Sequence, residues 1–134
     1  MWRALRRLGA AQVLDGLVAL PADSRTREQL EWLADSVVEG GGQATVWLAR
    51  PTSAAQEREI AAAMRAAVGV EYARLAGDAE RARASSVGTR KRTLGRLRRE
   101  LRRIRRRDYF PAPEAADARA AVEALAQSVA EVRA

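Results

Sequence analysis

The sequence predicts a mostly helical α+β fold, and three observations support this class. Of the 134 residues, 30 are alanine, the residue with the highest helix propensity. Apolar residues recur at spacings of three and four through most of the second half of the chain. Near the N-terminus, short apolar runs flank Asp15-Gly16, a dipeptide typical of a two-residue hairpin turn. The order helix, strand, strand, helix, strand is that of a truncated ferredoxin-like βαββαβ core that lacks its first strand, here followed by three helices.

The first two predicted elements of this core are a helix and a hairpin. Apolar residues at spacing three, beginning with Trp2, predict a short amphipathic helix that ends at Gly9. The runs 10–14 and 17–20 are then expected to pair across Asp15-Gly16, and a single bent strand through Asp15 is the alternative.

A second helix and a third strand complete the predicted core. Asp23 or Ser24 caps a helix that extends to about Glu39, with an inner face formed by Leu30, Leu33, Val37 and Trp32. The β-branched and aromatic segment Thr45–Ala49 predicts a strand. The three tryptophans, Trp2, Trp32 and Trp47, come from three different elements, and we expect them to share one core.

Three helices are predicted after residue 51. Ser53 caps the first, which Gly69 and Gly77 are expected to fray or bend before Arg83. The polar, basic segment 85–93 predicts a flexible linker, and a helix over 94–107 leads to the corner 108–113, where Tyr109 and Phe110 are expected to be core residues. The inner residues predicted for the first and last helices are Ile60, Met64, Val68, Tyr72, Leu75, Val122, Leu125, Val129 and Val132. The predicted parts are therefore residues 1–51, 52–84, 85–93 and 94–134, which are expected to form one compact domain.

Composition excludes several functions. The chain has no cysteine and no histidine, so it can form no disulfide and offers no thiolate or imidazole to a metal or a catalytic triad. The scattered acidic pairs are interleaved with arginine and indicate surface ion pairing, so we predict no enzyme activity, no metal site and no cofactor. No apolar run of about 18 residues and no secretory signal is present, which predicts a cytoplasmic protein without a membrane partner.

Basic residues are concentrated in one window of the sequence. Residues 88–107 contain eleven Lys and Arg against one acid, Glu100, a net charge of +10 in a chain whose total is +7. Such a concentration is typical of a polyanion-binding surface, because neutralising phosphates releases condensed counterions. On a helix, the four apolar residues of this window share one sector, and Arg99, Arg102, Arg103 and Arg106 lie almost opposite. The predicted nucleic-acid-binding residues are Arg90, Lys91, Arg92, Arg96, Arg99, Arg102, Arg103, Arg106 and Arg107.

Several motifs occur in the order found in a known family. They are Trp2-Arg3-x-Leu5-x-Arg7-Leu8-Gly9-Ala10, Asp15-Gly16, Leu20-Pro21, Glu28-Gln29-Leu30-Glu31-Trp32-Leu33, Glu71-Tyr72, and the corner from Arg106 to Pro113. Together they resemble the N-terminal domain of the chromate resistance protein family ChrB. That domain usually begins with a further strand and a proline-containing loop, and a late start codon or a trimmed paralogue would account for their absence here.

The resemblance implies a bacterial transcriptional regulator of a chromate resistance operon that binds double-stranded promoter or operator DNA. A homodimer and a separately encoded sensory subunit are the further partners that we consider. Two alternatives stay open from the sequence: a protein-interaction module with a basic arm, and an accessory protein that senses chromate or another oxyanion through its clustered guanidinium groups.

Overall fold

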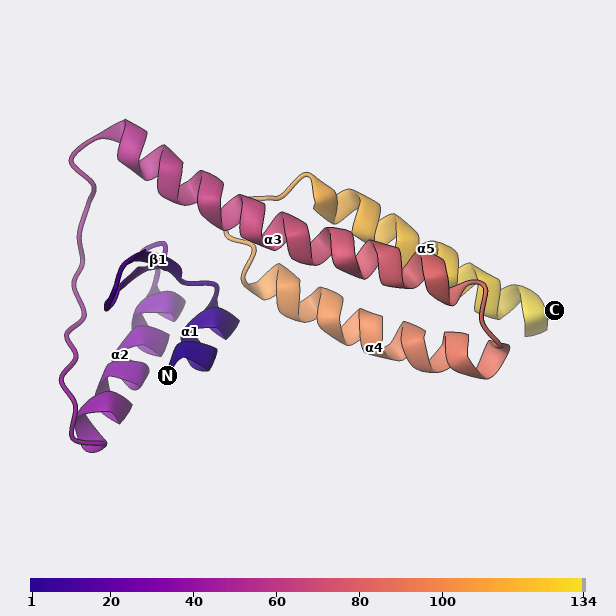
Figure 1. Cartoon of the computed structure of the whole chain (residues 1–134), viewed down its shortest axis with the longest axis horizontal. Helices are drawn as coiled ribbons and strands as arrows, with labels where there is room; N and C mark the ends of the chain where they lie inside the picture. The colour runs from indigo at the N-terminus through magenta and orange to yellow at the C-terminus, as the bar shows by residue number, and fades with distance from the viewer. Residues whose placement is uncertain (134) are drawn as a thin grey trace. The chain divides into compact units, whose positions relative to one another are not determined.

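The computed structural model describes residues 1–133, and 69% of the chain is helical. Five helices and one two-stranded antiparallel sheet confirm the predicted mostly helical α+β class. The chain divides into two compact units, Met1–Met64 and the residues from Arg65 onward, a division that differs from the predicted parts (Figure 1). The hairpin lies entirely in the first unit, and the two C-terminal helices lie entirely in the second.

Helix α1 (Trp2–Leu8) and the hairpin form as predicted. Gly9 ends α1 in the left-handed conformation, with φ of 77°, and its backbone N–H caps the helix. Strands β1 (Ala11–Leu14) and β2 (Leu17–Ala19) are antiparallel, so the alternative of one bent strand is wrong. At the turn Gly16 has φ of 78°, and within residues 1–133 only glycines have positive φ. The ladder is irregular between Gln12 and Leu14, where β1 carries one extra residue.

Helix α2 (Ser24–Glu39) begins at the predicted cap, Asp23. The Asp23 carboxylate accepts a hydrogen bond from the Thr26 backbone N–H at 2.8 Å, and the Asp23 N–H donates to the Thr26 hydroxyl at 3.2 Å. The Thr26 hydroxyl also donates to the carbonyl of Pro21, which buries this side chain and holds the chain before the helix against its first turn. The helix ends before Gly40, as expected from the three successive glycines.

Two predictions for the first unit are wrong. Residues 45–49 form no strand, and residues 43–50 have no regular secondary structure. The tryptophans do not share a core, because Trp32 and Trp47 are 78% and 79% exposed and Trp2 is also exposed. Both failures have the same physical reason. A strand and a buried aromatic side chain each need a neighbouring surface to pair with or pack against, and the only sheet among the described residues, with two strands, provides little of it. The ferredoxin-like order therefore stays a prediction.

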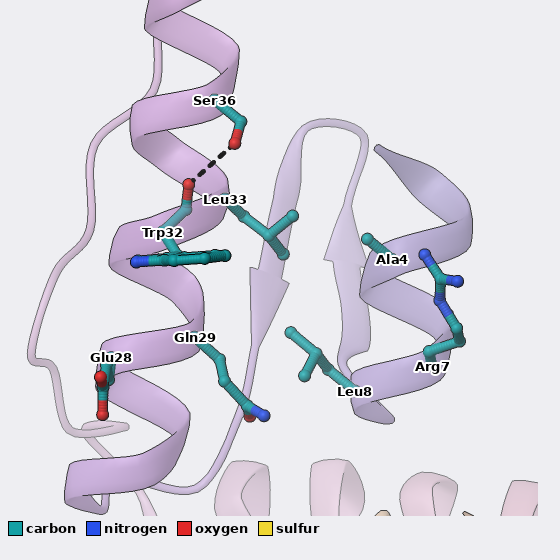
Figure 2. Close-up of a pocket in the computed structure, with 8 residues that line it drawn as sticks. All are labelled: Ala4, Arg7, Leu8, Glu28, Gln29, Trp32, Leu33 and Ser36. Carbon is teal, nitrogen blue, oxygen red and sulfur yellow. Dashed lines mark hydrogen bonds between the residues drawn. The ribbon is translucent and has the colours of Figure 1, made fainter.

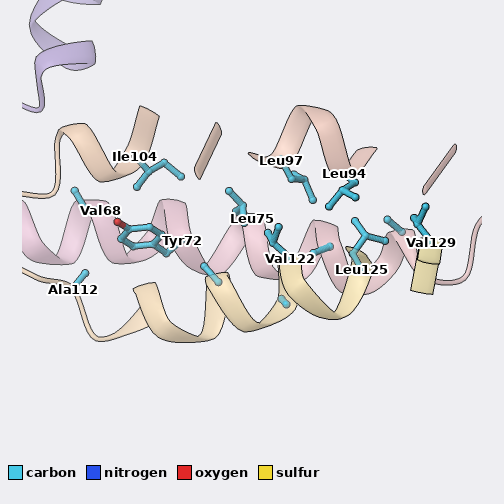
Figure 3. Close-up of a cluster of buried hydrophobic side chains, with 14 residues drawn as sticks. Val68, Tyr72, Leu75, Leu94, Leu97, Ile104, Ala112, Val122, Leu125 and Val129 are labelled. Atoms are coloured by element: carbon cyan, nitrogen blue, oxygen red, sulfur yellow. The ribbon is translucent and has the colours of Figure 1, made fainter. Parts of the chain in front are cut away.

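The second unit is a three-helix bundle of antiparallel neighbours (Figure 1). It contains the C-terminal part of α3 (Ala54–Ala82), all of α4 (Val87–Arg106) and α5 (Glu114–Arg133). Its core is lean, because alanines fill many of the positions between the few large side chains. Figure 3 shows the larger core residues, Val68, Tyr72, Leu75, Leu94, Leu97, Ile104, Val122, Leu125 and Val129, converging from the three helices. The side chain of Val132, a predicted inner residue, lies outside the described residues.

The joints of the bundle differ from the predictions. Helix α4 begins at Val87 with Ser86 as its N-cap, so most of the predicted linker 85–93 belongs to the helix. Its early start follows from capping, since the Ser86 hydroxyl accepts a hydrogen bond from the Thr89 N–H. Helix α3 is continuous through Gly69, which meets a spatial need: a Cβ there would lie 2.5 Å from the Glu114 carboxylate of α5.

Candidate nucleic-acid interface

Helix α4 separates its apolar and basic residues onto opposite faces. Leu94, Leu97 and Ile104 are buried against α3 and α5, and Leu101 packs at the edge of the same core. Figure 3 shows Leu94, Leu97 and Ile104 pointing from α4 into the bundle. This docking fixes the rotation of the helix, so the residues about half a turn away must face solvent.

Nine basic side chains of α4 are exposed. They include all four residues predicted to lie opposite the apolar sector. The complete set, which we call the α4 basic face, is Lys91, Arg92, Arg96, Arg98, Arg99, Arg102, Arg103, Arg105 and Arg106. Arg98 and Arg105 belong to this face although the sequence prediction did not include them. Successive members of this set lie within about one helical turn of each other. The nine charges therefore form one continuous cationic strip along the helix.

Arg90 was predicted to bind nucleic acid, but the structure places it, half-buried, on the side of α4 that contacts α5. It lies four residues before Leu94 and seven before Leu97, and therefore on the apolar face of α4. Its Nη1 donates a hydrogen bond to the backbone carbonyl of Ser128 on α5 at 3.2 Å, and its Nε is buried. Arg90 thus joins α4 to α5 and is not part of the α4 basic face.

Arg107 is also engaged within the protein. Its Nη2 and Nε donate to the two carboxylate oxygens of Glu71 at 2.6 and 3.0 Å, a bidentate pair between the end of α4 and the middle of α3. The guanidinium side chain is only 19% exposed, so the contact is shielded from water. Arg107 therefore holds the end of α4 in place, whereas the prediction made it a phosphate ligand.

The contacts that Arg92 and Arg96 of the α4 basic face make within α4 are weak. Arg96 Nη1 lies 3.4 Å from Glu100 Oε2, and both side chains are about half exposed. Arg92 donates to the Thr89 hydroxyl at 3.2 Å. Exposed ion pairs of this kind contribute at most about 1 kcal/mol, so a polyanion can replace them at little cost. The mutual repulsion of like charges three or four residues apart on α4 favours such a partner.

The corner after α4 is fixed by a partly buried hydrogen-bond network. The Tyr72 hydroxyl of α3 donates to Asp108 Oδ2 at 3.0 Å, and the Ala112 N–H donates to the same oxygen at 3.4 Å. Tyr109 and Phe110, predicted as core residues, are only half-buried here. Burial first, and then the bond to Asp108, raise the pKa of Tyr72 to about 12.

The Tyr72 network predicts a stability change at high pH. The pKa of the Tyr72 phenol is about 12 in the folded chain against an ordinary value of 10.0, so the neutral phenol stabilises the fold below pH 10. This contribution is lost as the pH rises from about 10 through 12. In a Y109F variant, which leaves Tyr72 as the only tyrosine, we expect ultraviolet absorbance to report phenolate formation with a midpoint near 12. An added D108N substitution lowers this pKa but leaves it above 10.0, because burial remains; a midpoint of 10.0 in Y109F alone would contradict the network.

The acidic side chains and the apolar content of the helices bear on two other features, a metal site and a membrane-spanning helix. No cluster of three or more acidic side chains within residues 1–133 could hold a metal ion. No helix over the same residues is long and apolar enough to cross a lipid bilayer.

A basic strip on a three-helix bundle, preceded by a small α/β unit, defines a candidate polyanion-binding protein, and the comparison with protein families identifies its family. The family described as "Protein ChrB, N-terminal" matches residues 1–87. Because this match covers more than half of the chain, the chain belongs to the ChrB N-terminal family, and the predicted resemblance is confirmed. The protein is accordingly ChrB-like and associated with chromate resistance. The searches of curated proteins and of solved structures gave no match.

The family match ends where the basic helix begins. Val87 is both the last matched residue and the first residue of α4. The family assignment therefore depends on α1, the hairpin, α2 and α3, and the chemistry of the α4 basic face must be argued from its own geometry. The resemblance noted from Arg106 to Pro113 lies outside the matched residues.

Proposed function

We propose that this ChrB-like protein is a DNA-binding transcriptional regulator that contacts the phosphates of double-stranded DNA through the α4 basic face. The observation that carries the proposal is the exposure of nine cations on one side of a helix whose opposite side is anchored in the bundle core. A helix held in this way presents its guanidinium groups without losing further conformational entropy of its backbone on binding.

Helix geometry and arginine chemistry support DNA as the polyanion. The strip from Lys91 to Arg106 covers 16 residues, so it is about 24 Å long at 1.5 Å per residue. A helix of this diameter fits the major groove of B-DNA, and it can equally lie along a phosphate backbone. Eight of the nine cations are arginine, whose planar fork binds a phosphate through two hydrogen bonds.

The first test is the salt dependence of binding to the DNA upstream of the chain's own gene. If the α4 basic face contacts six or more phosphates, affinity should fall by roughly a thousandfold or more between about 50 and 200 mM salt. Fluorescence anisotropy with nuclease-treated protein measures this slope. A control titration with an acidic polypeptide of equal length distinguishes phosphate binding from general attraction to anions. A flat salt response with the duplex would contradict the proposal.

A further inference from the structure

The first unit exposes most of the chain's large apolar side chains. Of the eleven large hydrophobic residues that are exposed in the described structure, only Val70 lies outside it. The other ten lie between Met1 and Leu48, in a unit of 64 residues with very few buried apolar residues. Monomeric soluble proteins rarely leave so large an apolar fraction of one small unit in contact with water.

Two segments of the first unit have backbone groups that are available for β pairing. The first is the outer edge of β2, which carries no hydrogen-bonded neighbour, since the sheet of the described chain consists of β1 and β2 alone. The other edge, that of β1, is interrupted by the extra residue between Gln12 and Leu14. Because a bulge disrupts the ladder of a strand, β2 offers the better template for another strand.

The second feature is the segment 43–50, which carries the apolar residues of a strand but pairs with nothing. Within residues 1–133, no backbone hydrogen bond joins this segment to another part of the chain. Trp47 Nε1 donates to Thr45 Oγ1 at 3.0 Å, so these two side chains lie on one side of the segment, as alternate residues do in a β-strand. Val46 and Leu48, the next alternating pair, are both exposed.

An apolar groove lies between α1 and α2 in the same unit. Its volume is about 310 Å³, and it is lined by Ala4 and Leu8 of α1 and by Gln29, Trp32 and Leu33 of α2, among others. Figure 2 shows Leu33 and Gln29 projecting from α2 toward Leu8 of α1. Apolar side chains from an added strand would remove this surface from water.

We infer that the first unit pairs with a second copy of the chain by reciprocal strand addition. Residues 43–50 of each copy extend the sheet of the other at the free edge of β2, and their apolar side chains cover the α1–α2 groove. A two-fold axis satisfies both copies at once, because each contributes one unpaired strand segment and one free edge.

The exposed area is large enough for such a dimer. A tryptophan side chain buries roughly 150–250 Å², so covering Trp32 and Trp47 in both copies removes about 600 Å² from water. The exposed leucine and valine side chains of the same unit bring the total to about the 1,000 Å² that a specific interface requires. The interface is independent of the α4 basic face, so it can be tested without DNA.

A disulfide experiment tests the pairing directly, because the chain has no cysteine of its own. Two single variants, V18C on β2 and V46C on the segment, are mixed and oxidised, and any V18C–V46C disulfide is then necessarily between copies. We expect this mixed disulfide to exceed that formed between V18C and the control variant V70C, whose residue is also an exposed valine. Equal yields for the two mixtures would overturn the inference.

The oligomeric state provides the second test. Light scattering after chromatography of nuclease-treated protein should show a concentration-dependent dimer, and V46P should weaken it by about tenfold or more, since proline removes a ladder donor in both copies. The control is V70D, which we expect to leave the dimer unchanged. Proline is not used at this position because it would break α3. Unaltered helical circular dichroism of V46P shows that the fold is retained. A monomer at all concentrations, or a dimer insensitive to V46P, overturns the inference while leaving the DNA-binding proposal untouched.

Discussion

Reversing the charge of Arg99, Arg102 and Arg103 to glutamate should weaken binding to duplex DNA by roughly a hundredfold or more. The three side chains are exposed on α4 and lie opposite its buried leucines. Each substitution removes a cation that would displace a counterion from DNA and adds an anion that repels phosphate. Anisotropy titration with the upstream duplex at fixed salt measures the loss.

A matched variant separates local from overall charge. Arg3, Arg6 and Arg7 of α1 are also exposed, and their reversal to glutamate changes the net charge by the same amount. We expect this control to retain most of its affinity. Similar losses in the two triple variants would mean that net charge alone drives binding, which would contradict an interface on α4. Because the substituted side chains are exposed, the helical circular dichroism of both variants should match that of the parent chain.

The rotation of α4 could be predicted from the sequence because it depends on local periodicity. The spacing of Leu94, Leu97, Leu101 and Ile104 sets the buried sector, and the structure leaves the four arginines predicted opposite it exposed. The same helical periodicity places Arg90 in the buried sector, because it lies four residues before Leu94 and seven before Leu97. Arg90 therefore differs from the exposed arginines of the same window in its helical phase, although its charge is the same.

Other features depend on contacts between distant residues, which periodicity does not contain. The bond between Arg107 and Glu71 joins residues 36 positions apart, and nothing in the local sequence distinguishes this arginine from its neighbours. Residues 45–49 have the composition of a strand, but a strand requires a partner for its backbone groups. Trp32 and Trp47 have the size of core residues, yet the first unit offers too little packed surface to bury them.

Truncating Leu97 to alanine should lower the free energy of unfolding of the bundle by about 2–5 kcal/mol. Leu97 is fully buried, and its neighbours in the core include many alanines, which are too short to fill the cavity that the truncation leaves. Urea denaturation followed by far-ultraviolet circular dichroism measures the change.

Val70, 60% exposed on α3, gives the control: V70A should change stability by less than about 0.5 kcal/mol. Equal stability of L97A and V70A would contradict the anchoring of α4 through this residue. That anchoring also fixes which side of α4 faces solvent. L97A should therefore lose DNA binding at a clearly lower urea concentration than the parent chain.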